Sequence, residues 1–169
     1  MLLYFAYGSN LHPLRLQERV PSADFIAIAV YDAHRIAFEK RGRDSSGKCN
    51  LVSTGIAGDR VFGAIYSLVP AHKPILDRFE GRGYRDRPIT VHGHGRDYAC
   101  FTYLAEQSHI DKSLKPFHWY KQLVVLGARY HRFPGKYISM LESFDSIEDT
   151  DTERRRKIEA LIENIGKYR

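Results

Sequence analysis

The sequence predicts an α+β fold in which strands occupy the first two-thirds of the chain and helices concentrate toward the C-terminus. Short runs of β-branched and aromatic residues, separated by turn residues, continue to about residue 104. Beyond them, apolar residues recur with helical spacing. With 43% hydrophobic and 27% charged residues, the 169-residue chain has the composition of a folded protein with its own core. We expect a single domain, residues 1–169.

Six runs are expected to form strands of one sheet or barrel, because they are enriched in Val, Ile, Tyr, Phe and Thr. The polar stretch from Arg41 to Lys48 contains two glycines and predicts a mobile surface loop, able to act as a lid. The six predicted strands are Leu2 to Tyr7, Asp24 to Tyr31, Arg35 to Glu39, Val61 to Leu68, Pro88 to Val91 and Tyr98 to Leu104.

A short helix is predicted from Pro70 to Phe79, since proline suits a first helical turn and Gly81 follows as a stop signal. Glu80 then falls at the C-terminus of this helix. Its expected apolar face consists of Ile75, Leu76 and Phe79.

Three more helices are expected in the last third. The first begins near Pro116 and ends at Gly127, and the second begins near Pro134. For the last helix, Thr150 and Glu153 match a Thr-x-x-Glu capping box. The apolar stripes of the three helices are Trp119, Leu123 and Leu126; Tyr137, Met140, Leu141 and Phe144; and Ile158, Leu161, Ile162 and Ile165.

Composition excludes several classes of protein. Cys49 and Cys100 have no metal-ligand or redox spacing, so we expect a cytoplasmic, reduced protein without a metal. A disulfide between the two cysteines is kept as an alternative. The apolar N-terminal run is typical of a strand, and no stretch approaches the ~20 apolar residues that would span a membrane.

The net charge of +6 permits binding to nucleic acid, but the basic residues are scattered. Their densest cluster, residues 154–157, falls where a solvated helix face is expected. We therefore expect no nucleic-acid partner and no membrane partner. A positive field of this kind also attracts small anionic substrates.

The first predicted strand runs directly into Gly8, Ser9 and Asn10. Glycine lets the chain turn and lets a ligand approach the backbone, and successive N–H groups in such a turn bind carboxylates or oxyanions. Alternatively, the same residues are typical of a tight turn with an Asn cap.

The chain resembles the γ-glutamyl cyclotransferase family from Leu3 to about Ser143. The likeness rests on several short motifs in the family's order. They are the run Tyr4 to Leu11, the strand Gly63 to Tyr66, the segment Leu76 to Gly81 with its acidic residue, Tyr84, the strand Cys100 to Leu104, and Tyr120 to Gln122.

The resemblance implies a small mixed β-barrel flanked by helices, a γ-glutamyl small molecule as substrate, no cofactor, and a homodimer, the state often found among relatives. It assigns the catalytic acid/base role to Glu80. The substrate-binding residues that it implies are Tyr4, Phe5, Ala6, Tyr7, Gly8, Ser9, Asn10, Tyr84, Tyr103 and Tyr120. For the last three tyrosines, a core aromatic with a bonded hydroxyl is the competing interpretation.

The implied reaction is intramolecular. The α-amine of a γ-glutamyl-amino acid or peptide attacks its own γ-carbonyl, which closes 5-oxoproline and releases the attached amine. Independently, the helix dipole and apolar neighbours such as Phe79 predict a raised pKa for Glu80, which Arg78, Arg82 and Arg85 would oppose.

Two alternatives stay open. One is the same chemistry on γ-glutamylamines or on a γ-glutamylated biosynthetic intermediate. The other is a non-catalytic binding module on the same fold.

Overall fold

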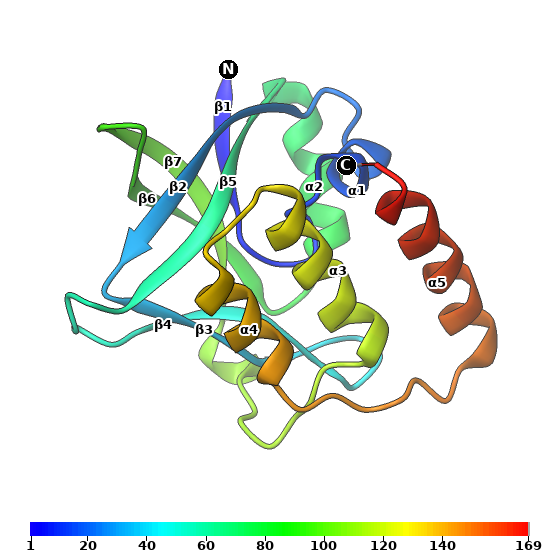
Figure 1. Ribbon diagram of the computed structural model, residues 1–169. Helices are drawn as coiled ribbons and strands as arrows, with labels where there is room; N and C mark the ends of the chain where they lie inside the picture. The colour runs from blue at the N-terminus through cyan, green and yellow to red at the C-terminus, as the bar shows by residue number, and fades with distance from the viewer. Residues whose placement is uncertain (169) are drawn as a thin grey trace.

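The computed structural model describes residues 1–168, and its centre is a closed five-stranded barrel (Figure 1). The strands follow the order β1-β5-β2-β6-β7. Neighbouring strands are antiparallel except β1 and β7, which are parallel, so the barrel is mixed as predicted. The barrel strands are β1 (Leu2–Ala6), β2 (Asp24–Asp32), β5 (Arg60–Leu68), β6 (Tyr84–Gly93) and β7 (Arg96–Ala105).

A separate two-stranded sheet pairs β3 (His34–Arg41) with β4 (Gly47–Ser53). Strand β4 is a seventh strand, where the sequence predicted none. The expected surface loop is instead a hydrogen-bonded hairpin turn, in which the Asp44 carboxylate accepts from the Ser46 N–H at 3.1 Å. Ser46 and Gly47 are buried, and the Gly47 N–H donates to the Lys115 carbonyl at 2.9 Å, which ties the turn to the segment before α3.

Helices follow the predicted distribution, with three in the last third of the chain. Among these, α3 contacts both α4 and α5 (Figure 1). A 3₁₀ turn, Pro70–His72, leads into α2, and a second one covers Gln107–His109. The helices are α1 (Pro13–Arg19), α2 (Lys73–Glu80), α3 (His118–Tyr130), α4 (Gly135–Ser143) and α5 (Thr152–Gly166).

Two predicted helix starts were wrong by one or two residues. Helix α3 begins after an extended Phe117 rather than at Pro116, because the backbone around Phe117 pairs with Ile147. The Thr150 capping box does not form. The Asp151 carboxylate caps α5 instead, accepting from the Arg154 N–H at 2.9 Å.

Gly127 does not end α3, as the sequence suggested, but lies buried inside it. A Cβ at this position would stand 2.6 Å from the Cβ of Leu11. Glycine therefore lets α3 pack directly on the loop that follows β1.

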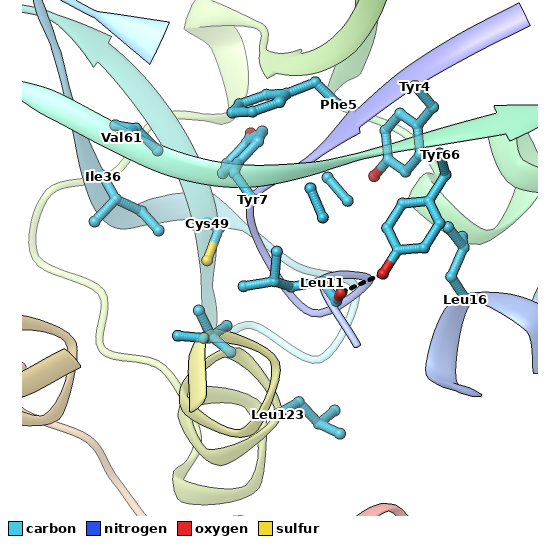
Figure 2. Packing of buried hydrophobic residues seen from close by; sticks show 14 of the residues in the cluster. Tyr4, Phe5, Tyr7, Leu11, Leu16, Ile36, Cys49, Val61, Tyr66 and Leu123 are labelled. Atoms are coloured by element: carbon cyan, nitrogen blue, oxygen red, sulfur yellow. Dashed lines mark hydrogen bonds between the residues drawn. The ribbon is translucent and has the colours of Figure 1, made fainter. Parts of the chain in front are cut away.

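The core joins the barrel to α3. Figure 2 shows Tyr4, Phe5 and Tyr7 near the loop residue Leu11, with Leu123 of α3 below them. Phe5 is fully buried, and its ring fits over strand β5 because Gly63 has no side chain, since a Cβ there would lie 2.4 Å from the ring. Within residues 1–168, no helix is both long enough and apolar enough to cross a bilayer.

Candidate active site

The loop between β1 and α1 is held from two sides. It turns at Gly8, whose carbonyl accepts from the Leu11 N–H at 3.0 Å. The Leu11 carbonyl in turn accepts from the Tyr66 hydroxyl at 2.6 Å, drawn in Figure 2, and from His131 Nε2 at 2.9 Å. Because both donors are buried, the loop has a fixed position on the barrel.

Glu80 reaches this loop from α2. It is the last residue of the helix, which ends at Gly81 because that residue adopts a φ of 76°. Asn10 Nδ2 donates to Glu80 Oε1 at 2.6 Å, and the Tyr4 hydroxyl lies 3.5 Å from the same oxygen. Two segments about 70 residues apart in the chain thus meet at one carboxylate.

Burial raises the pKa of the Glu80 carboxyl, while the charges of Arg19 and Lys40 oppose the shift. The direction agrees with the sequence prediction, but the predicted neighbours were wrong. Phe79 is 52% exposed, and its ring lies under the Arg19 guanidinium rather than against Glu80.

The opposing arginines were also misassigned. Arg78 and Arg82 are exposed, and Arg85 pairs with Glu106. Arg19 instead donates to Asn10 Oδ1 at 2.8 Å, so a guanidinium, an amide and a carboxylate form one chain of contacts.

A small inner cavity of about 20 Å³ lies between the loop and Glu80. It contains nearly all the residues that the sequence assigned to the site. Phe5 and Ala6 are the exceptions, because both are fully buried in the barrel core and do not line it. The lining residues are Tyr4, Tyr7, Gly8, Ser9, Asn10, Cys49, Glu80, Tyr84, Tyr103 and Tyr120.

Three tyrosine hydroxyls in this lining are used in structural hydrogen bonds. Tyr7 donates to the Tyr103 carbonyl at 2.6 Å, Tyr103 donates to Asp77, and Tyr84 donates to the Cys49 carbonyl. These side chains shape the cavity with their rings and are fixed by their own bonds.

Tyr120 differs from the others. Its hydroxyl accepts from the Cys49 N–H at 3.1 Å, and within residues 1–168 the partner for its own proton is the Cys49 sulfur, a weak acceptor. Because sulfur is a weak acceptor, this proton can be given to a stronger acceptor on a ligand in the cavity.

The loop supplies further donors. In the described part of the chain, the N–H groups of Gly8, Ser9 and Asn10 have no hydrogen-bonded acceptor, and all three residues line the inner cavity. Gly8 is needed for close packing, since a Cβ there would lie 3.1 Å from Cys49 Cβ. Such a row of free N–H groups suits an oxyanion or a carboxylate.

An outer cavity of about 370 Å³ adjoins the inner one, and the two share Ser9, Glu80, Tyr84 and Tyr120. Sequence reasoning missed its positive lining, because the residues come from three separate segments, α1, the β3–β4 hairpin and α5, and match no motif. The cationic lining residues are Arg15, Arg19, Lys40, Arg43, Lys48 and Arg154.

Cys49 also lines the inner cavity and was considered only as a possible disulfide partner of Cys100. Both cysteines are free and buried. Burial raises the pKa of the Cys49 thiol to about 12, which disfavours a nucleophilic thiolate at neutral pH. Within residues 1–168, no three His, Cys, Asp or Glu side chains are grouped to hold a metal.

Comparison with known proteins places this chain in a family. A model described as the AIG2-like family matches residues 60–141. Gamma-glutamylcyclotransferase from Bos taurus is 31% identical over 98% of this chain and 87% of its own length. The chain belongs to the γ-glutamylcyclotransferase family.

Other γ-glutamylcyclotransferase relatives agree. The Homo sapiens protein of that name is 28% identical over the same shares of the two chains. A solved structure titled "Gamma-glutamyl cyclotransferase" has a TM-score of 0.83 at 26% identity, covering 96% of this chain and 98% of its own. The resemblance seen in the sequence is confirmed, and the chain is an enzyme of this family.

Proposed function

We propose that this enzyme cyclises γ-glutamyl-amino acids or peptides to 5-oxoproline and releases the attached amine, with Glu80 as general base and acid. The observation that carries the proposal is the 2.6 Å bond between Asn10 Nδ2 and Glu80 Oε1 inside the cavity lined by the Tyr7–Asn10 loop. It sets one proton-exchanging carboxyl opposite a row of free N–H groups.

The chemistry needs one proton-transfer group. Glu80 takes a proton from the substrate α-ammonium, and the free amine forms a C–N bond to the γ-carbonyl carbon. The bond from this carbon to the leaving nitrogen then breaks as Glu80 returns the proton to that nitrogen. The ring nitrogen still carries a second proton, which Glu80 passes to the released amine in the same way, so the products are the neutral lactam and an ammonium ion. A carboxyl with a raised pKa suits both transfers near neutral pH.

The remaining groups orient the substrate. The N–H groups of Gly8, Ser9 and Asn10 suit the developing oxyanion or the substrate α-carboxylate, and the Tyr120 proton, held only by the Cys49 sulfur, suits a second acceptor. The inner cavity holds little more than one water, so it is too small for a whole glutamyl group. We therefore place the substrate across its junction with the outer cavity.

Replacement of the proposed base tests the function. Glu80→Gln keeps the shape and an acceptor for Asn10 but cannot move protons. We expect it to fold and to lower the kcat for 5-oxoproline formation at least about 100-fold. Turnover is followed by 5-oxoproline release from γ-glutamyl-alanine.

The matched control is Glu163→Gln, because Glu163 is exposed on α5. It should leave turnover at the wild-type level. Equal turnover by wild type and Glu80→Gln would remove Glu80 from the mechanism.

A panel of γ-glutamyl-amino acids, γ-glutamylamines and glutathione separates the substrate classes by relative kcat/KM. A folded protein that forms 5-oxoproline from none of them would support the binding-module alternative. A cytoplasmic location and a site without metal stay predictions from the cysteine content, and a homodimer and a mechanism without cofactor stay predictions of the family resemblance.

A further inference from the structure

The outer cavity has more cations than partners for them. Its lining contains six basic side chains and two acidic ones, Asp44 and Glu80. Lys48 pairs with Asp44 at 2.7 Å, and Arg154 pairs with Asp149 outside the cavity. Within residues 1–168, the remaining four cations form no ion pair with either carboxylate of the lining. These four are Arg15, Arg19, Lys40 and Arg43.

Lys40 is the clearest unpaired charge. The residue is only 3% exposed, yet within the described chain its ammonium makes no hydrogen bond and no ion pair, and it lies 4.4 Å from the centre of the Tyr84 ring. Because Tyr84 lines both cavities, Lys40 stands at their junction. Its charge is close enough to Glu80 to lower the pKa of that carboxyl.

Two arginines extend this positive region. Arg43 forms no ion pair within the described chain, and its guanidinium packs over the end of α2, 3.1 Å from where a Cβ on Gly81 would lie. Arg15 is 9% exposed and pairs with Glu18 through Nη1, but its buried Nε has no partner. Among these cations Lys40 is the one that is both buried and without an ion pair in the described chain, and a buried unpaired charge is unfavourable, so the arrangement suits an anionic ligand.

The number of unpaired groups exceeds what a neutral amino acid would satisfy. The free N–H groups of the Gly8 loop already suit the α-carboxylate of the glutamyl part. A neutral leaving amino acid brings one further carboxylate, which leaves Lys40 or Arg43 without an anion. A second negative group on the leaving amine would pair with the remaining cation.

We propose that the preferred substrates are γ-glutamyl conjugates of amines that carry two negative groups, above all the acidic amino acids, and that Lys40 and Arg43 select them. This inference rests on the proposed function, because the outer cavity must receive the leaving amine. For γ-glutamyl-glutamate, the ring closes as described, the amide C–N bond breaks, and the products are 5-oxoproline and glutamate. No water or other reactant is consumed.

The test compares two conjugates that differ in one charge. The kcat/KM for γ-glutamyl-glutamate should exceed that for γ-glutamyl-glutamine about tenfold or more in the wild-type enzyme. Lys40→Met and Arg43→Gln should each reduce this ratio several-fold. A third conjugate, γ-glutamyl-O-phosphoserine, shows whether carboxylate or phosphate is preferred as the second anion.

Lys40→Met removes a buried group, so Arg43→Gln at an exposed position keeps the test valid if the first variant fails to fold. The matched controls are Lys136→Met and Arg87→Gln, two exposed cations that line neither cavity, and they should keep the wild-type ratio.

The outcomes separate this inference from the function on which it rests. Turnover of both conjugates with a ratio near one, or with a ratio that neither variant changes, overturns the inference and leaves the cyclotransferase function intact. Failure of the folded wild-type enzyme to release 5-oxoproline from any conjugate overturns both.

Discussion

Glu80 is a residue whose burial works against stability. Its raised pKa means that the folded state holds the proton more tightly than the unfolded chain does. Stability therefore decreases as the pH rises from the ordinary glutamate pKa through the raised value, because the buried group must ionise. This is the behaviour expected where a group is placed for reactivity.

Glu80→Gln should therefore be more stable than wild type at neutral pH, since the amide stays neutral. The gain in Tm should increase with pH across that window and shrink in acid. Thermal unfolding at a series of pH values checks this. A gain that is the same at pH 4 and pH 8 would contradict the assigned pKa direction.

Arg19 acts on the same carboxyl through its charge. Because this charge lowers the pKa of Glu80, Arg19→Gln should raise that pKa further. The acid limb of the kcat/KM profile, where the base is lost by protonation, should move to higher pH. Arg156→Gln, an exposed change on α5, is the control and should leave the limb in place.

Some site residues were predictable and others were not. Glu80, Asn10 and Tyr120 stand in short motifs with recognisable order. Arg19 and Lys40 influence the same carboxyl only because separate segments fold against each other, and no local pattern marks either of them.

At the scale of elements, the site depends on how closely α3 packs on the loop after β1. Gly127 provides this approach, since a side chain there would contact Leu11 and the His12 backbone nitrogen at 2.9 Å or less. The helix cannot shift without moving the loop whose N–H groups face the inner cavity.

Gly127→Ala should accordingly destabilise the fold by about 1–3 kcal/mol and lower kcat/KM, because the added methyl overpacks this contact. Gly166→Ala at the end of α5 meets open space and is the control. It should be neutral or stabilising by up to about 1 kcal/mol. Urea unfolding of both variants measures the two changes in the free energy of unfolding. Equal changes would show that the contact between α3 and the loop is not tight.

Strand order and helix order were largely predictable from periodicity, but β4 was not. Its alternation includes Asn50, a buried polar residue that donates to Glu39 at 3.1 Å and accepts from the Ala105 N–H at 2.9 Å. Tertiary partners stabilise this strand, and its own composition gives only a weak β signal.

At the scale of the whole molecule, a buried carboxylate fastens the C-terminal helix. Asp149 accepts from Trp119 Nε1 at 2.8 Å and from Arg154 Nε at 2.7 Å. It therefore links α3 to α5 beside the outer cavity, which both partners line. The Arg154 hydrogen bond holds the pKa of Asp149 well below its usual range.

Asp149→Asn should destabilise the protein by about 1.5–3 kcal/mol at neutral pH, the usual size of a charged hydrogen bond. Because the folded-state pKa is depressed, the wild-type advantage exists above the unfolded aspartate pKa and is lost as the pH falls below about 4. Urea unfolding at pH 7 and pH 3 checks this. Asp145→Asn, whose side chain is 80% exposed, is the control and should change stability by less than about 0.5 kcal/mol.

The contacts of Cys49 have a consequence for how this enzyme can diverge. Its N–H donates to the Tyr120 hydroxyl and its carbonyl accepts from the Tyr84 hydroxyl, so two backbone atoms hold the two phenols. Every amino acid except proline offers the same two peptide atoms. Since the side chain itself is buried and packs against Gly8, we expect small residues to replace Cys49 in homologues of similar backbone without displacing either phenol.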